Sequence, residues 1–401
     1  MSIDIADLLV KAQALAPEFE AWRRDIHQHP ELGFEEHRTS ERVAEALQGW
    51  GYQVTRGLGG TGVVGQLRRG SSTRRLGLRA DMDALPITET SGLPHASLHA
   101  GVMHACGHDG HTAMLLAAAK LLAESGRFDG TLNLIFQPAE EGLGGAVRMM
   151  RDGLFEQFPC DAVFAMHNMP GYAQGHLALR EGPAMASSDY VEITLHGVGG
   201  HGAMPHRAAD PVVAGASLVM ALQTVVSRNV DPLGMAVVTV GAFHAGQANN
   251  VIPESATLKL SVRALDRQVR SLLRERITAL AQAQAASFGC SATVDYRDGY
   301  AVLVNTTAET ALAREVALEL VGPQQVTLQA PALPGSEDFA FMLEKVPGSY
   351  LLIGNGDGQD ADHPFAGHCA CMVHNPGYDF NDRNLVRGAA YWALLAQRFL
   401  A

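Results

Sequence analysis

The chain of 401 residues exceeds the ~100–200 residues usual for one domain, so we expect two domains with enough material for a sizeable core. It is 47% hydrophobic and 18% charged, as ordinary globular proteins are, and its 5 scattered cysteines do not suggest a disulfide framework, which favours a reducing, cytoplasmic setting. A net charge of −12 argues against a nucleic-acid partner, because nucleic-acid-binding proteins usually carry a clustered basic face.

The amino-terminal segment, MSIDIADLLVKAQALAPEFEAWRRD, lacks the basic start, apolar middle and cleavage site of a secretory signal, and it carries acidic residues from Asp4 onward. The longest uncharged run, residues 211–227, has 17 residues and includes Gly, Ser, Gln and Thr. A membrane span needs about 20 predominantly apolar residues. We therefore interpret this run as a buried helix and expect no membrane partner.

Strand and helix patterns alternate in the first half of the chain. The predicted elements are a strand over 76–83, a helix over 111–124, a strand over 131–136, a helix over 144–157 and a strand over 161–166. Strands that alternate with helices of this length indicate βαβ units and a parallel sheet. The first part of the chain is therefore predicted to be an α/β layer system.

The pattern changes after about residue 185. The predicted elements are strands over 190–197, 235–245, 256–266 and 291–300, with helices over 209–228 and 267–288. Their order, β-α-β-β-α-β, is that of a ferredoxin-like unit. A helix over 307–322, a strand over 349–356 and a helix over 384–400 follow. We expect an inserted domain at 186–299 and a discontinuous first domain made of 1–185 and 300–401.

Side chains that can bind metals follow several predicted strands. Asp81 and Asp83 end the first strand, Glu140-Glu141 follow the strand over 131–136, and His167 follows the strand over 161–166. Cys106 and His108 precede a helix at the same edge. Because ligands of open α/β sheets bind outside the carboxyl ends of the strands, these groups are expected together. Cys, His and carboxylate ligands suit zinc or another divalent ion.

The sequence resembles the dinuclear-metal amidohydrolases and metallopeptidases that include aminoacylase, hippurate hydrolase and indole-acetyl-amino-acid hydrolase. The matching stretches run over nearly the whole chain: RRDIHQHPELGFEE (23–36), RADMDALPI (79–87), MHACGHDGHTAML (103–115), FQPAEEG (136–142), AMHNMPG (165–171), GVGGHGAMPH (197–206), NNVIPESA (249–256), SVRALD (261–266), GSEDF (335–339) and HNPGYDFND (374–382). The resemblance implies an α/β catalytic domain with a mixed, largely parallel sheet, and an inserted lid and dimerisation domain.

The resemblance also implies roles for individual residues. The ligands of two divalent ions, which can be zinc, manganese or cobalt, are expected to be Cys106, His108, Glu141, His167 and His374. Glu140 is expected to be the general base, and Asp81 is expected to orient a ligand. His104 and His111 fall outside the ligand set, and Asp109 is either a second orienting group or a carboxylate at a helix start.

The sequence departs from the wider family at two positions. Relatives begin the first metal motif with His-x-Asp, whereas this chain has Arg79-Ala80-Asp81, so Cys106 and His108 are expected to substitute for that ligand. The last motif reads Val373-His374-Asn375 where relatives often have two histidines, which leaves His374 as its candidate. Cys369-Ala370-Cys371 is interpreted as two ordinary thiols rather than a metal clip.

The inserted domain is expected to contribute polar groups to catalysis. By resemblance, His201 donates to the tetrahedral oxyanion, often across a dimer, and Asn250 contacts the substrate. Arg263 either holds a substrate carboxylate or forms a salt bridge at a strand edge. The resemblance implies a homodimer or a dimer of dimers, in which this domain closes on the substrate.

The leading functional hypothesis is metal-dependent hydrolysis of N-acyl amino acids to an amino acid and a carboxylate. The alternatives are a dipeptidase or carboxypeptidase of the same family, a hydrolase that uses Cys106 as a thiol nucleophile, and a metal- or peptide-binding protein without activity. The last is disfavoured because a binding protein does not need a base such as Glu140 beside its metals. Substrate preference depends on loops around 183–189, 329–336 and 357–368.

Overall fold

A computed structural model describes residues 3–356 and 371–401, which form two compact units. The larger unit comprises Met1–Gly182, Val304–Pro331 and Phe341–Ala401, and the smaller comprises Pro183–Leu303 and Ala332–Ala340. The second segment of the smaller unit is not evident in the sequence pattern. It belongs there because Leu333 exchanges backbone hydrogen bonds with Ala184 and Ala186.

The larger unit is built on an eight-stranded mixed sheet. Its strands stand in the order β1 (Gln53–Leu58), β2 (Gly62–Arg69), β4 (Gly130–Gln137), β3 (Arg75–Asp81), β5 (Ala162–Ala173), β16 (Gly348–Gly356), β6 (Leu177–Ala178) and β15 (Val326–Thr327). The central strands β4, β3, β5 and β16 pair in parallel, whereas β1, β2 and β6 pair antiparallel with their neighbours β2, β4 and β16. The mixed, largely parallel sheet expected from the sequence is confirmed.

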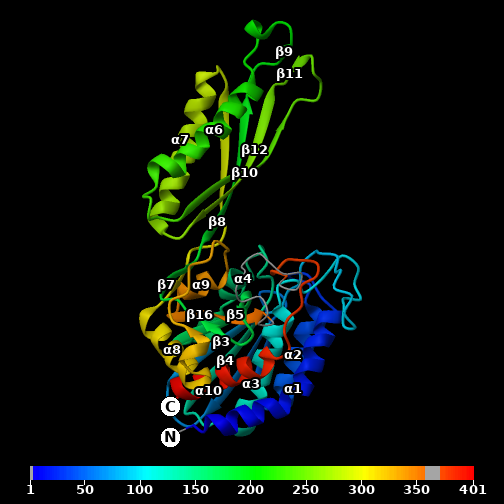
Figure 1. Cartoon of the computed structure of the whole chain (residues 1–401), viewed down its shortest axis with the longest axis vertical. Helices are drawn as coiled ribbons and strands as arrows, with labels where there is room; N and C mark the ends of the chain where they lie inside the picture. The colour runs from blue at the N-terminus through cyan, green and yellow to red at the C-terminus, as the bar shows by residue number, and fades with distance from the viewer. Residues whose placement is uncertain (1–2, 357–370) are drawn as a thin grey trace. The chain divides into compact units, whose positions relative to one another are not determined.

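Helices surround this sheet. They are α1 (Ile5–Gln28), α2 (His37–Gly49), α3 (His108–Ser125), α4 (Gly145–Arg151), α5 (Leu154–Gln157), α8 (Thr307–Val321) and α10 (Asn384–Phe399), with a 3-10 turn at Pro323–Gln325. Helices α1, α3 and α10 pack on one another (Figure 1). Helix α3 is buried along nearly its whole length, as the Ala/Leu run after His111 requires, and it anchors the loop before it in the core.

The smaller unit contains a four-stranded antiparallel sheet with strand order β10-β12-β8-β13. Its elements follow the chain as β8 (Ser187–His196), α6 (Pro211–Asn229), β10 (Ala236–Ala245), β12 (Ser255–Ala264), α7 (Arg267–Ser287) and β13 (Ser291–Asp298). Figure 1 shows α6 and α7 side by side along this sheet. A separate two-stranded antiparallel sheet is formed by β9 (Gly200–His201) and β11 (Val251–Ile252), and a 3-10 turn at Pro205–Arg207 follows β9. Strands β7 (Gly182–Met185) and β14 (Leu303–Asn305) and helix α9 (Phe339–Leu343) lie where the chain passes between the units.

Among the described residues, α6 is the one helix long and apolar enough to cross a membrane by length and composition. One face of it, with Leu218, Leu222 and Val225, is buried in the core of the smaller unit. Asp210 caps its amino end by accepting hydrogen bonds from the backbone of Val212 and Val213. These contacts are those of a helix that packs on a sheet, as the sequence pattern predicts.

Two predicted elements differ from the structure. The helix expected over 144–157 is interrupted, because Gly153 has a φ of 90° and separates α4 from α5. The strand expected over 161–166 continues to Ala173, because β16 pairs with it past His167. His167 therefore lies within β5 rather than after it.

Candidate metal centre

The central strands bring several of the candidate residues to one edge of the larger unit. Strand β3 lies between β4 and β5, and all three run parallel. Asp81 ends β3, Glu140 and Glu141 follow the end of β4, and His167 lies in the middle of β5. Parallel pairing of sequence-distant strands thus collects these side chains, as expected for an open α/β sheet.

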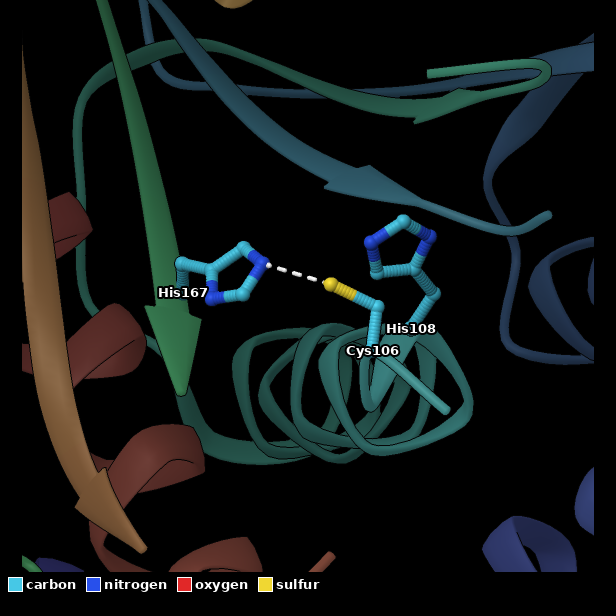
Figure 2. A group of neighbouring side chains, drawn as sticks. All are labelled: Cys106, His108 and His167. Carbon is cyan, nitrogen blue, oxygen red and sulfur yellow. Dashed lines mark hydrogen bonds between the residues drawn. The ribbon is translucent and has the colours of Figure 1, made fainter. Parts of the chain in front are cut away.

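Cys106 and His108 reach the same place from the start of α3, and Figure 2 shows both side chains directed toward the space that His167 faces. Between them, Gly107 adopts a φ of 85°, a conformation that L side chains rarely adopt. A Cβ atom on Gly107 would also lie 2.4 Å from the Asn168 amide and the Tyr378 hydroxyl. Glycine at this position therefore lets the two candidate ligands turn inward on either side of it.

The predicted ligands and Glu140 form three overlapping groups, in each of which the candidate ligand atoms lie within 4.8 Å of one another: Cys106, His108 and His167; Cys106, Glu141 and His374; and His108, Glu140 and Glu141. Three residues, Cys106, His108 and Glu141, each belong to two of these groups. The structure therefore brings together all five residues that the sequence nominated as ligands. Overlap at Cys106 is the arrangement needed for one thiolate to serve two neighbouring cations.

Interatomic distances in two groups are close to those between two ligands of one metal ion. Cys106 Sγ lies 3.3 Å from His167 Nε2, and Glu141 Oε1 lies 3.1 Å from His374 Nε2. Tetrahedral zinc geometry places two ligand atoms about 3.3–3.6 Å apart. Glu141 Oε1 and His108 Nε2 are buried without a hydrogen-bond partner among the described residues, although the Glu141 oxygen faces His374. Orphaned buried acceptors of this kind are what a bound cation would satisfy.

The ring of His167 is oriented as a neutral ligand. Its Nδ1 donates to the Asn168 carbonyl oxygen at 2.6 Å, which leaves the lone pair of Nε2 facing Cys106 (dashed line in Figure 2). Burial, followed by the neighbouring His111, lowers the pKa of His167 well below its usual value. A neutral imidazole with a free Nε2 is the form that binds a metal.

His111 forms hydrogen bonds at both ring nitrogens, and its ligand atom also lies within 4.8 Å of those of Asp81 and His108. Its Nε2 accepts from the backbone N–H of Asn168 at 2.9 Å, so Nδ1 carries the proton and donates to Asp81 Oδ1 at 2.6 Å. The other Asp81 oxygen accepts from Arg79 Nη1 at 2.7 Å. Asp81 therefore orients His111 directly, whereas Nδ1 of the candidate ligand His108 faces the acceptor Oδ1 of Asp83 at 3.1 Å.

Asn168 is a residue that the sequence analysis did not single out. Its Nδ2 donates to the Cys106 carbonyl oxygen at 2.6 Å, and its Oδ1 accepts from the Tyr378 hydroxyl at 2.6 Å. It thus joins the loop of one candidate ligand to the strand of another and to the segment that carries His374. Its place directly after His167 in AMHNMPG is the signal that would have indicated it.

Glu36 is a second residue that sequence reasoning missed, although it ends the RRDIHQHPELGFEE stretch. Its fully buried carboxylate accepts from the backbone N–H of Ala139 at 2.8 Å and from the Thr61 hydroxyl at 2.5 Å. Ala139 has a φ of 53°, a strained conformation for alanine, directly before Glu140. Burial raises the pKa of Glu36 to about 7.

Asp109 lies in the first turn of α3 but is not a solvent-exposed helix-start carboxylate. It is fully buried, accepts from Arg23 Nη1 at 3.4 Å and faces His27 Nδ1 at 2.8 Å. Arg23 also donates to Asp379, which follows His374 in the last motif. His104 is buried nearby, and neither of its ring nitrogens has a hydrogen-bond partner among the described residues.

The candidate residues of the inserted segment all lie in the smaller unit. His201 and Asn250 meet at the two-stranded β9–β11 sheet, where Gly202 donates its backbone N–H to the Asn250 carbonyl oxygen at 2.8 Å. His201 is exposed, and its Nδ1 accepts from the backbone N–H of Ala203 at 3.0 Å, so its proton is on Nε2. Arg263 donates to the Ser336 hydroxyl at 2.9 Å, and no carboxylate within residues 3–356 and 371–401 accepts from it.

Part of the last loop lies outside the described residues. This part includes Cys369, so the structure describes only Cys371 of the two cysteines that we interpreted as ordinary thiols. Cys371 is a free, half-buried cysteine. The predicted substrate-facing loop at 357–368 also lies outside them. His374, just after this segment, has a φ of 69° and is held by a hydrogen bond from its backbone N–H to the Ala105 carbonyl oxygen.

Comparison with known proteins gives consistent matches over the whole chain. Residues 77–398 match the model of peptidase family M20/M25/M40. The chain is 46% identical to a hippurate hydrolase of Campylobacter jejuni, over 98% of this chain and 100% of that protein. It is 39% identical to an N-acetyl-L-cysteine deacetylase of Bacillus subtilis, over 94% of this chain and 87% of that protein.

A structural match points the same way. The fold resembles a dinuclear-metal-binding peptidase of the M20 family from Bacillus subtilis, with a TM-score of 0.82 and 32% identity over 97% of this chain and 99% of that one. A thermostable carboxypeptidase of Saccharolobus solfataricus is 36% identical over 98% of this chain and 99% of that protein. The relatives therefore include enzymes named for acyl-amino-acid substrates and enzymes named for peptides.

Proposed function

Because the chain belongs to peptidase family M20/M25/M40, we propose that it is a metal-dependent amidohydrolase of N-acyl amino acids, which releases the amino acid and a carboxylate. One observation carries this proposal: five candidate ligands converge beside Glu140 in a chain 46% identical to a hippurate hydrolase. The names of the relatives favour acyl groups such as benzoyl, acetyl and indole-acetyl on the substrate.

Two divalent cations are the cofactors in this proposal. His108 and His167 would hold one cation and Glu141 and His374 the other, with the Cys106 thiolate shared between them. Such a pair would supply Lewis acidity that polarises the amide carbonyl and acidifies a water molecule. Zinc, manganese and cobalt all suit this mixed set of nitrogen, sulfur and oxygen ligands.

Glu140 is the proposed general base. It is 7% exposed and lies within the group that contains His108 and Glu141, so it faces the space where water would attack the amide. Its carboxylate would take a proton from the water and pass it to the leaving amine nitrogen. Ala139, which precedes the pair, has a left-handed conformation and donates its backbone N–H to Glu36, and this local geometry supports different roles for Glu140 and Glu141 in the proposal.

The smaller unit is proposed to be a ferredoxin-like lid and dimerisation domain. Its tip presents the Nε2–H of His201, a donor suited to the oxyanion of the tetrahedral intermediate, with Asn250 beside it. Arg263 is proposed to bind the substrate carboxylate, since in this structure a hydroxyl, not an acidic partner, accepts from it. Among the described residues β10 is an edge strand of its sheet, and it carries the exposed side chains of Val237 and Phe243. A homodimer or dimer of dimers in the cytoplasm would cover such an edge.

The alternatives fit the site less well. Burial and the Glu141 carboxylate raise the pKa of the Cys106 thiol well above its usual value, whereas a nucleophilic cysteine needs a lowered pKa. Cleavage of dipeptides or of carboxy-terminal residues uses the same chemistry. It is the second candidate function, because some relatives are named as carboxypeptidases. A binding protein without activity has no use for a buried base beside its metals.

The proposal is tested by amine release from a substrate panel. Metal-reconstituted protein is incubated with N-benzoyl, N-acetyl and indole-acetyl amino acids and with dipeptides, each with and without a chelator. Chelator-sensitive release that is fastest from an N-acyl amino acid supports the proposal. Faster release from dipeptides favours the peptidase alternative, and chelator-resistant release favours the thiol mechanism.

A further inference from the structure

We propose that Arg23 is a positioning residue that fastens the last motif, HNPGYDFND (374–382), to the amino-terminal helix and thereby places His374 at the metal centre. This inference rests on the proposed function, because it takes His374 as a metal ligand. Arg23 begins the RRDIHQHPELGFEE stretch, and Asp382 ends the last motif. A contact between them therefore joins the first and last of the stretches that mark this chain.

Arg23 stands at an unusual position on α1. The buried face of this helix carries Leu8, Ala12 and Phe19, and the same face continues with Arg23 and His27. An apolar stripe packs a helix onto its neighbours, so a fully buried guanidinium within it costs desolvation free energy. Because arginine keeps its charge in proteins, the cation must be balanced by partners inside the fold.

The guanidinium of Arg23 contacts side chains from three other parts of the larger unit. Its Nε donates to Asp382 Oδ1 at 2.7 Å, and its Nη1 donates to Asp379 Oδ1 at 2.8 Å and to Asp109 Oδ2 at 3.4 Å. Its Nη2 donates to His95 Nε2 at 3.2 Å, since a guanidinium has no acceptor. Helix α1, the loop with His95, the start of α3 and the last motif thus meet at one side chain.

His374 depends on its own segment for its position. Residues 374–376 are exposed, and His374 has a φ of 69°, a conformation that few residues with a side chain adopt. Such a backbone persists where its surroundings hold it. On one side, the backbone N–H of His374 donates to the Ala105 carbonyl oxygen at 2.7 Å. On the other side, the first ion pair is that of Asp379 with Arg23.

The charges around Arg23 explain why the segment needs this cation. Asp109, Asp379 and Asp382 all face one guanidinium, and Asp109 is fully buried. Without the cation the three carboxylates would repel one another, and residues 379–382 would move away from the start of α3. Lysine keeps the charge but has a single nitrogen, so it cannot span the positions of Nε, Nη1 and Nη2. Arg23→Lys therefore removes the forked contact and leaves a cation in place.

The experiment measures metal affinity rather than turnover. Metal-free wild type and Arg23→Lys are titrated with Zn²⁺ in competition with a chelating dye, and bound metal is counted by elemental analysis. The step lost in His374→Ala identifies the ion that His374 binds. We expect that step to weaken about 10-fold or more in Arg23→Lys, while the other stays within about twofold of wild type. Unchanged affinity at both steps, or equal losses at both, would overturn the inference.

A double variant tests whether Arg23 acts through His374. If it does, adding Arg23→Lys to His374→Ala should leave the affinity for the one remaining ion unchanged within about twofold, because the contact that Arg23 supports is already lost. If the remaining ion is bound about 10-fold more weakly in the double variant, Arg23 supports the whole centre rather than His374, and the inference fails.

The control variant is Arg24→Lys, the same replacement at the next residue. Arg24 donates to the other oxygen of Asp382 at 2.9 Å, but its side chain is 44% exposed. Exposed ion pairs contribute little, so we expect both binding steps to stay within about twofold of wild type. Equal losses in Arg24→Lys and Arg23→Lys would contradict a specific role for the buried arginine. If the wild type bound no divalent cation, the proposed function itself would fail, which separates the two outcomes.

Discussion

His374 Nε2 lies 3.1 Å from Glu141 Oε1, although the two residues belong to different sequence segments of the larger unit, Met1–Gly182 and Phe341–Ala401. The carboxylate oxygen is buried and has no hydrogen-bond partner among the described residues. Two facing ligand atoms at this distance fit a shared cation between them. The proposed metal centre therefore depends on contacts between chain segments that are distant in sequence.

Removal of the His374 ring should empty one of the two metal positions. In His374→Ala, we expect bound metal to fall from about two ions to about one per chain, because Cys106 and Glu141 alone do not complete a site. Elemental analysis after dialysis against trace metal measures this. His99→Ala, a change at an exposed histidine, is the control. Two tightly bound ions in His374→Ala would contradict the assignment of this ligand.

Glu140→Gln should separate chemistry from metal binding. The amide keeps the size of the side chain but cannot accept a proton from water, so we expect kcat to fall by roughly 10²–10⁴-fold or more while both metals stay bound. Turnover and metal content are measured on the same preparation. If metal is lost instead, the roles of Glu140 and Glu141 are reversed.

His201→Ala should lower kcat by about 10²–10³-fold without loss of metal, because a donor to the oxyanion acts in the transition state. His206→Ala, in the same exposed segment, is expected to have a much smaller effect. Steady-state kinetics with equal metal loading compare the two variants. Similar losses in both would indicate damage to the loop rather than loss of the donor.

Mixing two inactive variants tests whether His201 acts across a dimer. Subunits of His201→Ala and Glu140→Gln are exchanged in equal amounts, so that about half of the dimers hold one chain of each kind. If the partner supplies His201, one active site per mixed dimer is complete, and activity should return to about a quarter of wild type. A mixture that stays inactive despite demonstrated exchange would show that His201 acts within its own chain.

Glu36 should make stability depend on pH. Burial raises its pKa to about 7 in the folded state, against 4.5 for an ordinary glutamate. The folded state then holds a proton that the unfolded state releases, so this group's contribution to stability is present below pH 4.5 and falls as pH rises toward 7. This loss is absent in Glu36→Gln. Between pH 4.5 and 8 we therefore expect the free energy of unfolding of the variant to rise, relative to that of wild type, by up to roughly 3 kcal/mol.

Urea unfolding of the metal-free proteins at a series of pH values measures this difference. The comparison of wild type with Glu36→Gln cancels the other titrating groups that the two proteins share. A constant difference in the free energy of unfolding across that range would show that Glu36 is ionised with an ordinary pKa.

Much of the fold follows from local sequence patterns. The order of strands and helices in the smaller unit agrees with the alternation of apolar residues, and its two helices begin where Asp210 and Asp266 accept hydrogen bonds from the next backbone N–H groups. The buried character of α3 follows from its run of Ala and Leu. These features depend on neighbours in sequence, which is why sequence reasoning reaches them.

The roles of Asp81 and Asp83 illustrate what sequence reasoning cannot resolve. The two carboxylates are two residues apart, and the resemblance favoured Asp81 as the orienting group. Arg79 and His111 donate hydrogen bonds to the two oxygens of Asp81, which leaves Asp83 to contact His108. Those contacts exist only after α3 packs on the sheet. The length of β5 beyond His167 depends in the same way on pairing with β16.

The most direct test of the proposed function is hydrolysis of N-benzoylglycine recorded while metal-free protein is titrated with Zn²⁺ or Mn²⁺. We predict no hydrolysis before metal is added, a rate that rises with bound metal, and a maximum at about two ions per chain. Full activity in the metal-free protein, or no hydrolysis of this or any other N-acyl amino acid once two ions are bound, would contradict the account.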